Sequence, residues 1–146
     1  MLVAPPPQPH RAFLDERPWQ FALGHVFKPA VDFVLEGPDL SGPDVGYWRC
    51  DLVRGDRLSW TGKVYELFGL PAGNEIARAE AVRRYREGSR AVLERLRAFS
   101  IGNRCGFLLD ARMSAEGSGA HGIRILSAPL IERDRVVAIH GLKRAI

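Results

Sequence analysis

Few residues of this chain stand at spacings that support catalysis or metal binding. Cys50 and Cys105 do not form a C-x-x-C pair, and with four scattered histidines they match no zinc-binding pattern. No carboxylate pair, Ser/His/Asp set or phosphate-binding loop occurs at a usable spacing, and His25 and Asp32 have no partners for catalysis. We therefore expect no enzyme and no metal site, and we interpret both cysteines as small buried hydrophobic residues.

The elements that could position functional side chains are clearest between Gly46 and Pro71. Alternation predicts a strand over residues 47–53, a turn at Arg54-Gly55-Asp56 and a second strand over 57–60. A helix over 62–68 follows, capped by Thr61 and ended by Gly69 and Pro71. The side chains that share one face of the first strand are Trp48, Cys50 and Leu52.

The residues of this stretch also form a recognisable pattern. Gly46, Trp48, Asp51 and Leu52 give Gly-x-Trp-x-x-Asp-Leu, and residues 65–69 read Tyr-Glu-Leu-Phe-Gly. The pattern resembles the opening of a PAS domain. The resemblance implies an α+β fold, a five-stranded antiparallel sheet with helices on one face. The alternative is a half-buried hairpin packed on an amphipathic helix in another α+β fold.

The rest of the chain follows the order that the resemblance implies. Helices are predicted over 75–85 and 87–100, and strands over 105–113, 122–131 and 136–142. The resemblance extends from Gly46 to about Arg144. It weakens before the long helix, where a His-Pro-x-Asp-Arg motif is frequent in this branch. Residues 85–90 read Tyr-Arg-Glu-Gly-Ser-Arg, which retains only the final arginine.

Three regions are predicted along the chain. Residues 1–12 contain four prolines and are predicted to be a disordered tail. Residues 13–44 are predicted to form a helical extension and a linker, and residues 45–146 the PAS-like domain. Many PAS domains dimerise through such an extension, which implies a homodimer. The apolar candidates for this interface are Trp19, Leu23, Phe27, Val31 and Val34.

A PAS sheet curls around a small cavity between its inner face and its helices. The residues expected to line it are Leu58, Trp60, Phe68, Phe99, Phe107, Leu109, Ile125 and Ile139. Apolar side chains fill space equally well with or without a ligand, so a filled core and a ligand cavity both remain open.

We expect no haem or flavin cofactor. Haem needs an axial ligand, usually histidine, and His121 and His140 are interpreted as structural. Residues 103–108, Asn-Arg-Cys-Gly-Phe-Leu, superficially resemble the Asn-Cys-Arg-Phe-Leu motif of flavin-binding LOV domains. However, the order of Arg and Cys differs, and the LOV motif precedes the long helix instead of following it.

Charge and hydropathy argue against nucleic acid and membrane as partners. The net charge is +4, but the arginines of residues 75–100 are interleaved with glutamates, which is typical of a solvated helix face. No apolar run approaches the roughly 20 residues that span a bilayer. The N-terminus lacks the charged and apolar regions of a secretory signal, so we expect a cytoplasmic protein.

Together these patterns predict a bacterial sensory or regulatory signalling module that acts through protein–protein interaction, modulated by a small ligand. The alternative is a ligand-free dimerisation or adaptor domain. The last predicted strand runs into Lys-Arg-Ala-Ile instead of the frequent Asp-Ile-Thr and an output domain. We therefore expect a stand-alone protein or an excised fragment, whose partner is itself and an unidentified signalling protein.

Overall fold

The computed structural model describes residues 13, 24–28, 44–114 and 119–146 of the chain. They form a six-stranded antiparallel sheet in the order β1-β4-β5-β6-β2-β3. Its strands are β1 (His25–Phe27), β2 (Gly46–Asp51), β3 (Arg57–Trp60), β4 (Gly106–Arg112), β5 (Gly122–Glu132) and β6 (Arg135–Ala145). A 3-10 turn, η1 (Leu52–Arg54), follows β2, and three helices connect β3 to β4: α2 (Gly62–Phe68), α3 (Arg78–Arg83) and α4 (Glu87–Asn103). The α+β architecture predicted from the sequence is confirmed.

The hairpin of β2 and β3 forms where the alternation predicts it. Trp48 and Cys50 are buried and lie opposite Trp60 and Leu58. Gly55 and Asp56 adopt left-handed backbone conformations at the turn, which glycine accepts without steric strain. The two strands therefore present Trp48 and Trp60 to the same side of the sheet.

The start and the end of α2 are fixed by different groups. Thr61 does not cap the helix through its hydroxyl as predicted; instead its Oγ1 accepts a hydrogen bond from the Tyr47 backbone N–H at 3.0 Å. Gly69 ends the helix in a left-handed conformation, as expected. Thr61 thus ties the first turn of α2 to β2.

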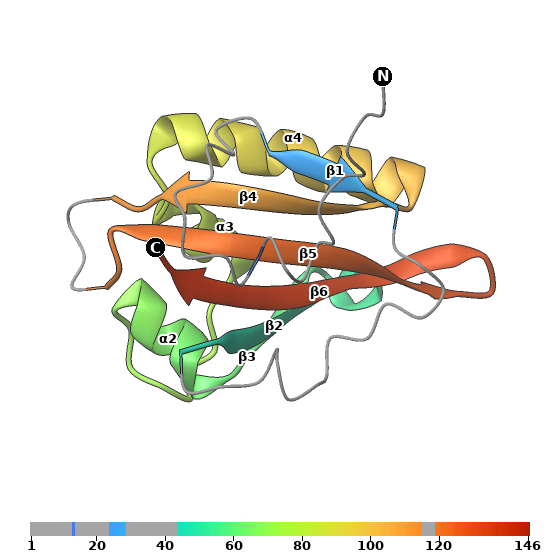
Figure 1. Cartoon of the computed structure of the whole chain (residues 1–146). Coiled ribbons are helices and arrows are strands. Elements are labelled where there is room, and N and C mark those ends of the chain that lie inside the picture. The colour runs from blue at the N-terminus through green and yellow to red at the C-terminus, as the bar shows by residue number, and fades with distance from the viewer. Residues whose placement is uncertain (1–12, 14–23, 29–43, 115–118) are drawn as a thin grey trace, which may run out of the picture.

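The three helices cover one face of the sheet, with α4 along β4 and α2 near the end that contains β2 and β6 (Figure 1). Between these layers lies the main hydrophobic core, which contains Phe68, Tyr85, Phe107, Leu109 and Ile125. Most of its strand residues alternate with residues on the opposite face, so the two-residue period decides which side chains enter this core.

The opposite face of the sheet carries a second apolar cluster. Leu108, Leu126 and Leu142 are buried there with Phe13, and Phe27, Val45 and Tyr47 pack around them. Arg124 on β5 donates from Nε to the Asp110 carboxylate on β4 at 2.8 Å within the same face. Residue 13 of the N-terminal segment therefore covers part of the outer face.

The sequence prediction is wrong in the number of strands. Residues 25–27 were assigned to a helical extension, yet they pair with β4 through His25–Leu108, Val26–Phe107 and Phe27–Gly106. The helical spacing of the apolar residues predicted the wrong element because pairing with the free edge of β4 satisfies the backbone hydrogen bonds of this segment. Phe27 contacts the outer cluster and lies next to Gly106.

We predict that Gly141→Ala severely destabilises the fold, because a Cβ at this position in β6 would overlap the carbonyl oxygen of Leu126 in β5. The expected loss in the free energy of unfolding, measured by urea denaturation, is about 3 kcal/mol or more. The control is Gly102→Ala in α4, where a Cβ meets no atom within 4 Å. This control should be neutral or should stabilise by up to about 1 kcal/mol. Equal effects of the two substitutions would contradict the prediction.

Candidate functional site

A small cavity of about 60 Å³ lies between the inner face of the sheet and helices α3 and α4. Strands β2, β3, β5 and β6 supply one wall, and the two helices with the segment between them supply the other. Its lining residues are Trp48, Cys50, Leu58, Trp60, Arg78, Ala81, Val82, Tyr85, Leu93, Arg97, Ile125, Ile139 and Lys143. The wall is therefore largely apolar, with a few polar side chains.

Lys143 is the unusual member of this wall. Its side chain is buried, with 8% of the residue exposed, and its Nζ donates a hydrogen bond to the Tyr85 hydroxyl at 3.1 Å. The ring centroids of Trp48, Trp60, Phe68 and Tyr85 all lie between 4.9 and 5.8 Å from Nζ. The amine thus sits among four aromatic rings, an arrangement that favours its cationic form electrostatically.

Burial opposes the charge on this amine. It lowers the pKa of Lys143 from 10.5 to about 7, because the desolvated ammonium loses its hydration. Burial likewise raises the pKa of the Tyr85 phenol. Burial, followed by the nearby Asp56 carboxylate, raises the pKa of the Cys50 thiol, so the thiol stays neutral at pH 7. Lys143 is therefore poised between its charged and neutral forms near neutral pH.

The two arginines of the wall are held by carboxylates from other elements. Arg97 on α4 donates to the Asp56 carboxylate of the β2–β3 turn at 2.8 Å, and Arg78 on α3 pairs with Glu94 on α4. These ion pairs tie the hairpin and α3 to the long helix. By contrast, Lys143 has no carboxylate partner among the described residues.

With this geometry established, comparison with known proteins is informative. No protein-family model and no curated protein matches the chain. Among solved structures, an RNA-binding light-oxygen-voltage receptor matches with 16% identity and a TM-score of 0.58, over 69% of this chain and 29% of that one. The chain thus spans less than a third of that receptor.

Two further structures match along most of their length. One is the N-terminal domain of a diguanylate cyclase with a PAS/PAC sensor from Marinobacter aquaeolei, with 13% identity, a TM-score of 0.60 and coverage of 69% and 94%. The other is a domain of a Haloarcula marismortui histidine kinase named for light and redox sensing, with 11% identity, a TM-score of 0.60 and coverage of 70% and 89%. This chain has the PAS fold. At these identities the likeness concerns the fold, as the sequence resemblance implied.

The PAS fold brings half of the predicted pocket residues to the cavity. Leu58, Trp60, Ile125 and Ile139 line it. Phe107 and Leu109 are buried in the adjoining core, and Phe68 packs on Trp60 with ring centroids 4.6 Å apart.

Phe99 lies elsewhere and corrects the predicted lining. It is 49% exposed on α4, whereas Leu96 and Ser100 are buried. Val92, Leu93 and Leu96 pack on the core, and the inner face of the helix continues to Ser100 instead of Phe99. A polar residue, Ser100, occupies the inner face because its hydroxyl donates to the Cys105 carbonyl.

Sequence reasoning missed Lys143, the most distinctive residue of the cavity. The last strand was predicted to end at Leu142, whereas β6 continues to Ala145. The two-residue period carried past the predicted end from Ile139 places Lys143 on the inner face, so the signal was present. Arg97 was among the arginines expected on a solvated helix face, and Tyr85 was not among the residues expected to line the cavity.

The predicted dimer-interface residues are mostly outside the described part of the chain. Trp19, Leu23, Val31 and Val34 lie there, and Phe27 is placed in β1. His140, considered above as a haem ligand, lies on the outer face, where its Nδ1 is 2.8 Å from the Tyr47 hydroxyl oxygen. Within the described residues no cluster of His, Cys, Asp or Glu could hold a metal ion, and no helix is long and apolar enough to cross a membrane.

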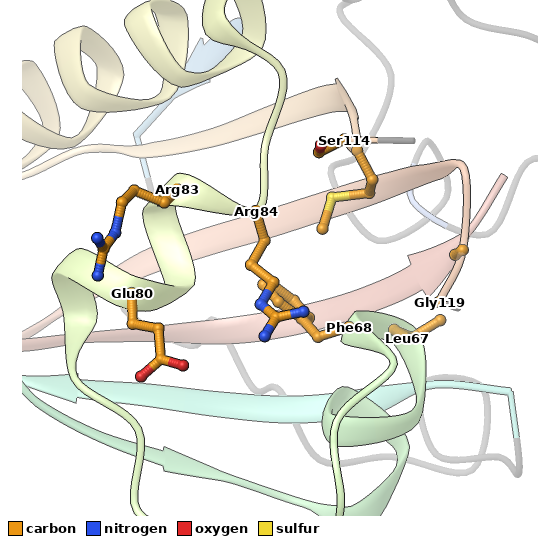
Figure 2. A pocket seen from close by; sticks show the side chains of 9 residues that line it. Leu67, Phe68, Glu80, Arg83, Arg84, Ser114 and Gly119 are labelled. Atoms are coloured by element: carbon orange, nitrogen blue, oxygen red, sulfur yellow. The ribbon is translucent and has the colours of Figure 1, made fainter. Parts of the chain in front are cut away.

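A second, larger pocket of about 410 Å³ opens beside α2 and α3 (Figure 2). Glu80, Arg83 and Arg84 border it on the α3 side, opposite Leu67 and Phe68 of α2. Its remaining wall includes Ser114 and Gly119, which flank residues 115–118 outside the described part of the chain. Because that wall is incomplete, the lysine cavity, whose lining residues are all described, is the better defined candidate site.

We predict that Lys143→Met stabilises the protein at pH 7. Between pH 7 and 10.5 the unfolded wild-type chain binds a proton that folded Lys143 does not, so wild-type stability rises with pH in this window. Methionine keeps an unbranched chain without the ammonium. The variant should be more stable at pH 7 by on the order of 3 kcal/mol, and the difference should shrink towards pH 10.

Urea denaturation of both proteins between pH 6.5 and about 10 measures this difference. Lys63→Met on α2 is the control, because Lys63 pairs with Glu66 at 3.4 Å beside the solvent. Its effect should be small and nearly constant with pH over this range. A less stable Lys143→Met variant, or a stability difference independent of pH, would show that burial does not lower the pKa of Lys143.

Proposed function

We propose that this chain is a sensory or regulatory signal-transduction module. A small molecule occupies the lysine cavity, and occupancy changes the contacts that the domain makes with another protein. The observation that carries the proposal is the buried amine of Lys143, which stands in an aromatic cavity without a carboxylate partner among the described residues. A residue that lowers stability in this way is typical of a functional site.

The similar structures support a signalling role at the level of the fold. Two of them are domains of a diguanylate cyclase with a PAS/PAC sensor and of a histidine kinase. Both names describe enzymes in which such a domain is associated with sensing. Transfer of this role to the present chain is part of our proposal, because a fold alone does not define a function.

Strand β6 offers a physical route from the cavity to a partner. Lys143 points to the inner face, while its neighbours Leu142 and His140 lie on the outer face with Leu126 and Tyr47. A shift of β6 on ligand binding therefore reaches the outer cluster, where Phe13 packs. We propose that the N-terminal segment and this face form the interaction surface, first with a second copy of the chain and then with a signalling protein.

Several finer assignments belong to the same proposal. The module is non-catalytic, bacterial and cytoplasmic, and it works without haem or flavin. Nucleic acid is not its partner, since Arg78 and Arg97 of the arginine-rich helices are held in ion pairs. The stretch 103–108, compared above with a LOV motif, lies at the end of α4 and in β4, and its Cys105 is not part of the cavity wall.

We expect native mass spectrometry of the full chain to show a mass excess that corresponds to a small molecule, without a visible absorption band. Denaturation should release the excess mass, and Lys143→Met should lose it. Val53 in η1, which is 67% exposed, offers a control: the Val53→Ala variant should retain the excess mass. An empty protein that also binds nothing from a cell extract would instead support the ligand-free adaptor.

We further predict that the full chain is a homodimer and that the double variant Trp19→Ala/Leu23→Ala weakens it at least about tenfold. Large apolar side chains dominate interface energetics, and loss of two such groups removes several kcal/mol. Sedimentation velocity over a concentration series measures the dissociation constant, and Val53→Ala is again the control. A wild-type chain that is monomeric at the highest concentration would refute dimerisation.

A further inference from the structure

The lysine cavity contains more hydrogen-bond donors than acceptors. The indole Nε1 atoms of Trp48 and Trp60 and the Nε of Arg97 are buried, and none has a partner among the described residues. All three residues line the cavity with Lys143. Each unsatisfied donor costs about 1–3 kcal/mol of desolvation, so the empty site is poorly compensated.

Acceptors are scarce in the same wall. It contains no aspartate or glutamate, and its side-chain oxygen and sulfur atoms come only from Tyr85 and Cys50. The Tyr85 oxygen already accepts from Lys143, and a thiol is a weak acceptor. The carboxylates of Asp56 and Glu94 approach the site but are engaged by Arg97 and Arg78. A ligand that brings acceptor oxygens and negative charge would satisfy what the wall lacks.

Size and the remaining lining define the rest of the ligand. A water molecule needs about 10–15 Å³ of such space, so about 60 Å³ holds roughly four to six non-hydrogen atoms. Leu58, Ile125 and Ile139 add apolar side chains on the same face of the sheet as Lys143 and the two tryptophans, and Ile125 is the cross-strand neighbour of Lys143. The ligand therefore has one anionic end and a short apolar end.

We propose that the cavity binds a short-chain monocarboxylate, of about the size of acetate or propionate, through an ion pair with Lys143. This inference rests on the proposed function and names the ligand class of that site. The carboxylate accepts from the Lys143 ammonium and from the buried Trp48 and Trp60 indoles, and its alkyl end contacts the aliphatic wall. Charge-assisted hydrogen bonds of this kind are the strongest that a protein offers.

Binding is coupled to protonation of Lys143. The groups that face it are Tyr85 before α4, Cys50 on β2, Arg97 on α4 and Arg78 on α3. The phenol and the thiol have raised pKa values and stay neutral, and both arginines are ion-paired with carboxylates. Lys143 has a pKa of about 7 without a ligand, so above this pH the Lys143 amine must take up a proton when the carboxylate binds.

The experiment is a calorimetric titration of the full chain with acetate, propionate and butyrate, and with the neutral isostere propionamide. We expect propionate to bind and propionamide to bind at least about tenfold more weakly. Propionate affinity should fall about tenfold per pH unit between pH 7.5 and 9, with uptake of nearly one proton per ligand at pH 8. The Trp48 and Trp60 indole N–H resonances, assigned with single Trp→Phe variants, should shift downfield on saturation.

Variants separate the ion pair from general effects on the fold. Lys143→Met and Lys143→Gln should each reduce propionate affinity at least about tenfold, and Lys63→Met should leave it unchanged. Thermal melts of each variant establish that it is folded, and the Trp resonances provide a second test on the wild-type chain itself. Lys143 variants that bind propionate as well as the wild type would overturn the proposal.

The remaining outcomes distinguish the ligand class from the proposed function. If propionamide binds as tightly as propionate, or if carboxylates fail while native mass spectrometry finds another bound molecule, the carboxylate proposal is wrong and the sensory function stands. If no carboxylate binds and no molecule is retained from a cell extract, both proposals are wrong.

Discussion

The sheet depends on one close approach, that of Gly141 in β6 to the backbone of Leu126 in β5. Strand β6 lies in the interior of the sheet, with β5 on one side and β2 on the other, so it joins the two halves that are separated in sequence. Only a residue without a Cβ fits at this contact. Two positions further on, Lys143 reaches the inner face at a level set by the same pairing. The position of the amine in the cavity thus follows from the pairing of β6 with β5.

The amine itself acts against stability. A buried ammonium loses hydration, and neither the Tyr85 hydroxyl nor the four rings supply a full counter-charge. A methionine would fill the same space without this cost. Arg78 and Arg97, which line the same cavity, are compensated by carboxylates, so the contrast is local. An uncompensated cation beside unpaired indole donors is consistent with a site whose missing partner arrives as a ligand.

The sequence predicted those parts of the fold that local signals determine. The β2–β3 hairpin, α2 and the closing strands follow from alternation and from Gly55 and Gly69, whose left-handed conformations mark the turn and the helix end. Strand β1 could not be predicted, because the apolar residues around it follow a helical spacing. Residues 25–27 are extended only because they pair with β4. Such pairing is a tertiary effect that outweighs local propensity.

The site was predicted less completely than the fold, and for different reasons. Aliphatic and aromatic residues such as Leu58 and Ile139 were found because inward-facing positions of strands follow a fixed period. Phe99 was misplaced because successive residues of a helix point about 100° apart, so an error of one residue changes the face. The hydrogen-bonded Ser100 occupies the inner position instead. Lys143 was missed because charged residues are expected at the surface, which made Leu142 a natural place to end the strand.

The same strand explains how events in the cavity could reach the surface of the molecule. Successive residues of β6 alternate between the two faces, so Lys143 belongs to the helix-covered core and Leu142 to the outer cluster with Phe13. Because both clusters are packed, a displacement of the strand that improves contacts to an anion inside must change contacts outside. In our proposal the ligand binds one arrangement of β6 more tightly than another, and that difference in affinity sets the largest shift it can produce. An ion pair formed in one arrangement and lost in the other is a suitable source of that difference, since a charge-assisted hydrogen bond contributes about 1.5–3 kcal/mol.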